Sequence, residues 1–190
     1  MKLKTTLAGA LLATSVLAAP SIQAADYTID TKGAHASINF RVSHLGYSWL
    51  EGRFNEFSGQ FSYDEANPNA SAVEVEINTA SVDSNHAERD KHLRSGDFLD
   101  VDTYPKASFK STGFSADNGV LSGDLTLHGV TKPVEIQVTK IGQGDDPWGG
   151  YRAGFSGTTE FQMKDFGITK NLGPASETVY MELHVEGIRQ

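Results

Sequence analysis

Hydrophobic and polar residues alternate with a period of two along most of the chain. In the segment SINFRV the apolar residues are Ile38, Phe40 and Val42, and polar residues stand between them. This alternation is typical of antiparallel strands with one buried face and one face in water. It recurs at 72–78 (AVEVEIN), 134–141 (VEIQVTKI) and 178–187 (TVYMELHVEG), and less regularly at 106–111, 119–129 and 151–163.

Turn-forming residues separate these segments. The clusters are DEANPNA at 64–70, SADNG at 115–119, HGVTKP at 128–133 and GQGDDPWGG at 142–150. The short spacing between strands favours hairpin connections over helical crossovers. The pattern predicts an all-β fold of about eight strands, and an eight-stranded antiparallel barrel would remove the exposed edges that promote aggregation.

The predicted inward face combines aromatic residues with glycines. An eight-stranded barrel can hold one small ligand if small side chains leave space inside. The same residues also fit a filled core in which the glycines mark bends, so both interpretations stay open. The residues are Phe40, Phe57, Phe61, Phe109, Phe155 and Phe161, with Gly59, Gly123 and Gly157.

One stretch, SNHAERDKHLRSGDFLD at 84–100, differs from the strand pattern. It predicts a short helix near residues 84–95, with Asp83 or Ser84 as the N-cap and Gly96 at the end. The apolar residues Leu93, Phe98 and Leu99 would lay this helix over a barrel mouth, while its charges face water. We therefore expect a lid.

The histidines of this stretch do not predict a metal site. His86 and His92 are six residues apart, which is about 600° of helical rotation, so they point in different directions. A pair formed by Glu88 and His92 would need a further ligand from elsewhere. The chain also has neither a G-x-S-x-G motif nor a phosphate-binding loop. We expect no metal, no cofactor and no catalytic site.

The N-terminus has the pattern of a secretory signal peptide, with Lys2 and Lys4 before an apolar run and small residues at Ala24 and Ala25. Cleavage after Ala24 would leave one domain at 25–190, with 14 basic and 24 acidic residues. That net negative charge argues against nucleic acid as a partner. The chain has no cysteine, which excludes disulfides and thiolate sites. We expect an exported, periplasmic protein without stable membrane insertion.

Several blocks of the sequence carry a family resemblance. HAERDKHLRSGDFLD, YPKASFKST, GDLTLHGVTKPV, IGQGDDPWGGYRAGF and LGPASETV resemble the YceI-like family of exported polyisoprenoid-binding proteins, in the same order. The segment 33–59 resembles the first hairpin of that family. The resemblance implies an extended lipocalin-like barrel of eight strands with a helix across one side. It also implies a long isoprenoid chain, such as a polyprenyl quinone, in the apolar interior.

The residues predicted to line the ligand site combine the inward face with the lid. They are Phe40, Val42, Phe57, Phe61, Leu93, Phe98, Leu99, Phe109, Leu125, Leu127, Phe155, Phe161 and Met181. A polar head group would need donors near the mouth, for which the candidates are His44, Tyr47, Trp49, His86 and Arg89.

Three functions remain open from the sequence. The favoured one is a lipid-binding carrier, and the alternatives are a stress-related interaction protein with a structural lipid and an enzyme acting on a bound lipid. A homodimer through an outer face of the barrel is also compatible with the sequence. Because His86 and His92 lie in the lid, a further hypothesis is that their protonation loosens it.

Overall fold

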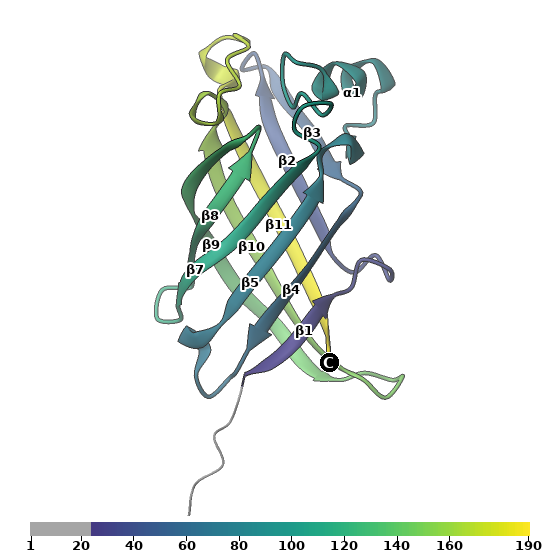
Figure 1. The fold of residues 1–190 in the computed structure, drawn as a ribbon, viewed down its shortest axis with the longest axis vertical. Coiled ribbons are helices and arrows are strands. Elements are labelled where there is room, and N and C mark those ends of the chain that lie inside the picture. The colour runs from purple at the N-terminus through teal and green to yellow at the C-terminus, as the bar shows by residue number, and fades with distance from the viewer. Residues whose placement is uncertain (1–23) are drawn as a thin grey trace, which may run out of the picture.

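The computed structural model describes residues 24–190, so the predicted signal peptide lies almost wholly outside the described residues. Within that range, eleven strands form one antiparallel sheet (Figure 1). They are β1 (Ala25–Ile29), β2 (Ser37–His44), β3 (Ser48–Phe54), β4 (Phe57–Tyr63), β5 (Ala72–Asn78), β6 (Val82–Asp83), β7 (Lys106–Ser115), β8 (Val120–Leu127), β9 (Val130–Asp145), β10 (Tyr151–Gln162) and β11 (Thr178–Arg189).

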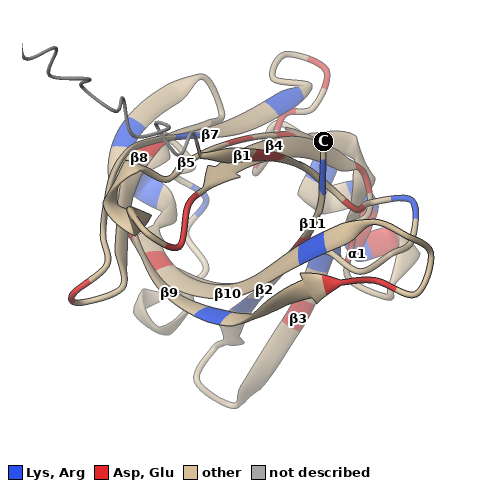
Figure 2. Ribbon diagram, turned by 90° about the horizontal axis from the view of Figure 1, so that it is seen from below, with Lys and Arg blue, Asp and Glu red and all other residues tan. Residues whose placement is uncertain are grey.

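Strand β11 closes the sheet into a barrel. On one side it pairs with β10 over nearly its whole length. On the other side its first half pairs with β2 and its last residues pair with β1. The closed ring runs β1-β4-β5-β7-β8-β9-β10-β11 and returns to β1. Seen along its axis, the strands encircle one central space (Figure 2). The predicted eight-stranded antiparallel barrel is confirmed.

The remaining strands extend the wall at the other end of the barrel. β2 continues from β11 to β3, and β3 pairs with the short β6 through Arg53 and Phe54. The chain reaches β6 directly from β5 through the 3-10 turn η2 (Thr79–Ser81). The wall is therefore completed by β4 and β1 at one end and by β2, β3 and β6 at the other.

Strand β9 is longer than its sequence suggests. The turn predicted at 128–133 spans only residues 128 and 129, and Pro133 lies inside the strand. Strand β9 pairs with β10 only from Gln137 onward. Pro133, which has no backbone N–H, therefore leaves no hydrogen bond to β10 unmade. The 3-10 turn η3 (Met163–Phe166) contacts both β9 and β10 here, with Phe166 1% exposed.

Aromatic rings lie against glycines on neighbouring strands. A Cβ atom at Gly123 would overlap the ring of Phe109, and it would also stand 2.7 Å from the carbonyl oxygen of Lys110. Gly123 therefore lets a ring pack against the wall, while Gly59 and Gly157 lie against the aliphatic side chains of Ile29 and Ile136. The same arrangement as at Gly123 pairs Gly52 with Phe40 and Gly187 with Phe61.

The predicted helix is present as α1 (Ala87–Arg94), but its start differs from the prediction. His86 is the N-cap, and its Nδ1 accepts the amide of Arg89 at 3.3 Å. Neither Asp83 nor Ser84 caps the helix, because the hydroxyl of Ser84 donates to Asp90 at 2.5 Å and the carboxylate of Asp83 accepts the amide of Asn85 at 2.8 Å. The helix ends at Arg94, before Gly96. Among residues 24–190, no helix is long and apolar enough to cross a bilayer.

The charges of α1 do not simply face water, contrary to expectation. Asp90 is buried, with 7% exposure, and Arg89 Nε donates to Ser84 at 2.7 Å. Arg94 reaches back to the carbonyl oxygens of Ala80 and Val82 at 2.7 and 2.6 Å. These bonds tie the helix to the β5–β6 corner, so the lid is anchored on one side (Figure 1).

We expect Gly123→Ala to destabilise the protein by about 1–3 kcal/mol, because the added methyl group must displace the Phe109 ring. Gly113→Ala is the matched control on β7, since a methyl group at that position would meet no other atom within 4 Å. That control should change stability by no more than about 0.5 kcal/mol. Urea unfolding followed by circular dichroism measures both variants, and equal midpoints would contradict the packing argument.

Candidate ligand-binding cavity

An apolar cavity of about 500 Å³ runs inside the barrel. Each of the eleven strands contributes at least one residue to its wall, from Ile29 of β1 to Leu183 of β11. The lid adds Leu93, Phe98 and Leu99 at one end. A cavity of this size and lining is typical of small-molecule sites. The barrel is hollow, and the interpretation as a filled core is wrong.

All thirteen residues predicted to line the ligand site lie on this wall. The aromatic members also contact one another: Phe61 and Phe155 meet edge to face with ring centroids 5.6 Å apart. The place of the ten strand residues follows from the alternation, since inward and outward positions alternate along a strand. Leu93, Phe98 and Leu99 reach the wall from α1 and the segment after it. The role of all thirteen in ligand binding stays a prediction.

The wall also contains residues outside the thirteen predicted for the ligand site. Large aliphatic residues dominate this group, which includes Leu50, Leu121, Val134, Ile136, Val138, Val179, Leu183 and Val185. Leu121 continues the alternation of Leu125 and Leu127, and the residues of β11 continue that of Met181, so extending the alternation would have found them. The residues of β9 form the apolar face of the alternating segment 134–141. Leu50 lies on β3, where no ligand-site residue was predicted.

The cavity wall includes basic and imidazole side chains from α1 and the end of β2. Of the predicted head-group donors, His44 and Arg89 lie on the cavity wall, and His92 joins them. Tyr47 and Trp49 are 87% and 50% exposed and lie outside the cavity. His86 serves as the helix cap instead. The structure therefore brings together two of the five predicted donors.

An ion-pair chain connects α1 to the loop before β11. His92 Nε2 lies 2.8 Å from Asp97 Oδ2, and Lys170 Nζ lies 2.6 Å from the same oxygen. Hydrogen bonds from Lys170 and then His92 lower the pKa of Asp97. A proton on His92 would strengthen its pairing with Asp97, which opposes the hypothesis that protonation of His92 loosens the lid. His86 differs, because a proton on Nδ1 would remove its capping acceptor.

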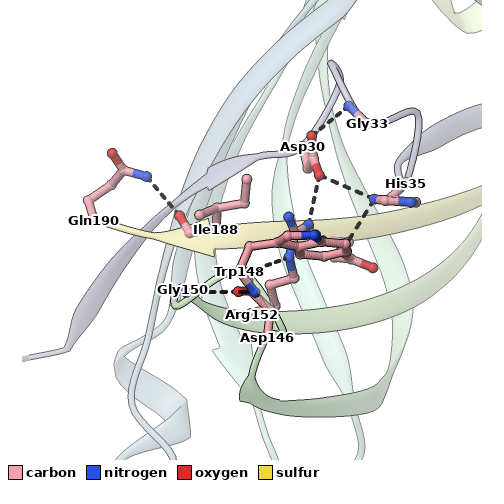
Figure 3. Close-up of polar contacts among 10 residues, drawn as sticks. Asp30, Gly33, His35, Asp146, Trp148, Gly150, Arg152, Ile188 and Gln190 are labelled. Carbon is pink, nitrogen blue, oxygen red and sulfur yellow. Dashed lines mark hydrogen bonds and ion pairs between the residues drawn. The ribbon is translucent and has the colours of Figure 1, made fainter.

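A second polar cluster lies on the outer wall, centred on Arg152 (Figure 3). Arg152 Nη1 bonds Asp30 at 2.7 Å and Glu186 at 2.6 Å, and its Nε bonds Asp146 at 2.9 Å. The Arg152 bond, the amide of Gly33 and His35 hold the pKa of Asp30 at about 2, although burial opposes this shift. The cluster joins the end of β1, the β9–β10 hairpin and β11.

Three members of this cluster lie close enough together to hold a metal ion. Ligand atoms of Asp30, His35 and Glu186 lie within 4.8 Å of one another. The Arg152 guanidinium bonds both carboxylates, so a positive charge already stands between them. A cation would have to displace it, and we interpret the cluster as an ion-pair clamp.

Comparison with known proteins assigns the family. The model of the YceI-like domain matches residues 27–187. The chain belongs to the YceI-like family. A UPF0312 protein of Pseudomonas aeruginosa is 60% identical over 190 residues, covering 99% of this chain and all of the relative. A UPF0312 protein of Shewanella sp. strain ANA-3 is 59% identical over 191 residues, with the same coverage.

Several solved structures share the barrel fold. The YCEI protein of Campylobacter jejuni has a TM-score of 0.69 at 26% identity, over 78% of this chain and 90% of that one. BcnA of Burkholderia cenocepacia has a TM-score of 0.72 at 22% identity, over 83% and 98%. A polyisoprenoid binding domain from Saccharophagus degradans has a TM-score of 0.63 at 18% identity, over 88% and 100%. The last two show the fold alone.

The Arg152 clamp predicts how stability depends on acid. Because the pKa of Asp30 is lower in the folded protein than its usual 3.8, its contribution is complete above that value. The contribution is lost as the pH falls from 3.8 towards about 2. We expect Asp30→Asn to lower the melting temperature at neutral pH and to flatten its fall in this window.

Asp124→Asn, at an exposed position of β8, is the matched control. Differential scanning fluorimetry from pH 7 to pH 2 compares the two variants. If the melting temperatures of the wild type and Asp30→Asn fall equally steeply below pH 3.8, the assignment of this stability to Asp30 is contradicted.

Proposed function

We propose that the protein is an exported binding protein that carries one long-chain isoprenoid lipid, of the polyprenyl quinone type, in its barrel. The observation that carries the proposal is the continuous apolar cavity to which every strand contributes. The family assignment supports it, as does the likeness to a domain described as polyisoprenoid binding.

The cavity favours a long apolar chain over a compact polar ligand. Each methylene that leaves water for such a wall contributes roughly 0.8 kcal/mol. A prenyl tail would lie among rings such as Phe61, Phe109 and Phe155. Its head group would stay near His44, Arg89 and His92 of the wall.

The polar groups of the wall support a carrier better than an enzyme. Arg89 is bonded to Ser84, and His92 pairs with Asp97. The carboxylate of Asp97 is shared with Lys170, so His92 and Asp97 belong to an ion-pair chain that links α1 to the loop before β11. These groups can position a head group, and the proposal assigns them no chemical step.

Export and assembly belong to the same proposal. The pattern of residues 1–24 supports secretion, cleavage after Ala24 and a periplasmic location. A homodimer through the outer wall stays a prediction. Holding a lipid does not require one, because a single chain encloses the cavity.

We expect Leu183→Trp to lose the lipid, because this residue points into the cavity in the middle of β11 and an indole would fill the path of the chain. Glu182→Trp is the matched control, since its side chain is 66% exposed on the outer face of the same strand. Native mass spectrometry of both proteins, purified after export, measures the fraction that carries lipid.

Wild type and Glu182→Trp should show one added mass that organic extraction identifies by its isoprene spacing. Circular dichroism checks that Leu183→Trp remains folded. Equal lipid content in all three proteins would place the ligand elsewhere, and a wild-type protein without lipid would contradict the proposed function.

A further inference from the structure

Exposed large hydrophobic residues concentrate at one end of the barrel. Among residues 24–190 there are six, and four lie on the β2–β3 hairpin and the loop before β11. These are Leu45 at 51%, Tyr47 at 87%, Trp49 at 50% and Leu172 at 36% exposure. We call these four residues the apolar tip. The other two, Ile141 and Trp148, belong to β9 and to the β9–β10 hairpin at the opposite end (Figure 1).

The two loops of the apolar tip are bonded to each other. The amide of Leu45 donates to Ser176 Oγ at 3.2 Å, and that hydroxyl donates to the carbonyl of Ser43 at 2.6 Å. Trp49 packs edge to face on Tyr180 of β11, with ring centroids 5.5 Å apart. These hydrogen bonds hold the two loops together, and the exposed side chains project from them into solvent.

The apolar tip is continuous with the cavity. Leu172 is one of its four residues and also lines the cavity wall. His44 and Leu50, which flank the hairpin residues in sequence, line the wall as well. A lipid that enters or leaves at this end of the barrel would meet Leu50 and Leu172 between the cavity and the outer surface.

The charge of the two loops suits an anionic surface. Residues 43–50 and 166–176 contain no Asp or Glu, although the chain has 24 acidic residues. Arg41 lies over the Trp49 ring at 4.6 Å. At the edges of the tip, Glu177 pairs with Lys164, and Asp97 pairs with Lys170. Glu51 stands opposite Arg41 in the β2–β3 ladder. The projecting surface itself carries no negative charge.

We propose that the apolar tip docks on a phospholipid bilayer and inserts shallowly at its interface, so that lipid passes between membrane and cavity. This deepens the proposed function and rests on it. Aromatic side chains with an apolar ring and a polar edge favour the headgroup level of a bilayer. A cationic residue beside them can contact lipid phosphates. Docking at this end makes the bilayer and the cavity one continuous apolar path.

The two tryptophans of the chain provide the test, because they lie at opposite ends. In Trp148→Phe, Trp49 is the reporter, and we expect a blue shift of its emission with vesicles of phosphatidylethanolamine and phosphatidylglycerol. Lipids brominated near the headgroup should quench it. In Trp49→Phe, the remaining Trp148 should show neither effect. Unchanged Trp49 emission at saturating vesicle concentration would overturn the proposal.

Variants at the tip test the same surface by partition. Leu45→Ser combined with Tyr47→Ser should weaken vesicle binding about tenfold or more, because two large apolar side chains no longer enter the interface. Ile141→Ser, at an equally exposed position on the far end, should bind as the wild type does. If the tip variant instead changes only the oligomeric mass, the tip faces a second copy of the chain and the proposal is wrong.

The docking proposal and the carrier proposal can be contradicted independently of each other. Leu183→Trp should still dock on vesicles, because its change lies inside the barrel. A protein that holds lipid but shows no Trp49 response overturns docking and leaves the carrier intact. A protein that docks but never holds lipid supports docking and contradicts the carrier.

Discussion

The barrel depends on the pairing of one strand with three others. β11 bonds β10 along one edge, and it divides its other edge between β2 and β1. Without that divided edge the sheet would remain open, and the inward residues of eight strands would be exposed to water. Closure around a lumen is therefore the constraint from which the cavity, the lid and the mouth follow. It also removes nearly all edge strands, which is a protection against aggregation.

The wall separates apolar and polar contacts between its two faces. Inside, rings pack over glycines and leave a smooth apolar lumen. Outside, Arg152 ties three separate segments together through Asp30, Asp146 and Glu186. Every buried side-chain nitrogen or oxygen in residues 24–190 has a hydrogen-bond partner. Binding and cohesion thus depend on different residues, so the lumen can vary without loosening the clamp.

The alternation of period two was enough to predict the barrel and the ten strand residues of the predicted ligand site, because inward and outward positions are fixed by strand geometry. Leu93, Phe98 and Leu99 were predicted instead from the helical stretch at 84–100. Three features escaped these patterns. The N-cap of α1 is His86, because the hydroxyl of Ser84 is bonded to Asp90 instead. Strand β9 passes through Pro133 only because β10 does not pair there. The Arg152 clamp joins Asp30 to a residue 122 positions away, and no local pattern shows such a contact.

The divided edge of β11 also affects when the barrel can close during synthesis. β1 and β2 leave the ribosome first, yet their partner is the last strand of the chain. At about 5–20 residues per second, synthesis takes on the order of ten seconds or more to deliver β11. Pairings of such long sequence separation also form slowly. Throughout that interval the first hairpin has an unpaired edge and an uncovered apolar face, so the nascent chain depends on remaining unfolded or shielded until its final residues emerge.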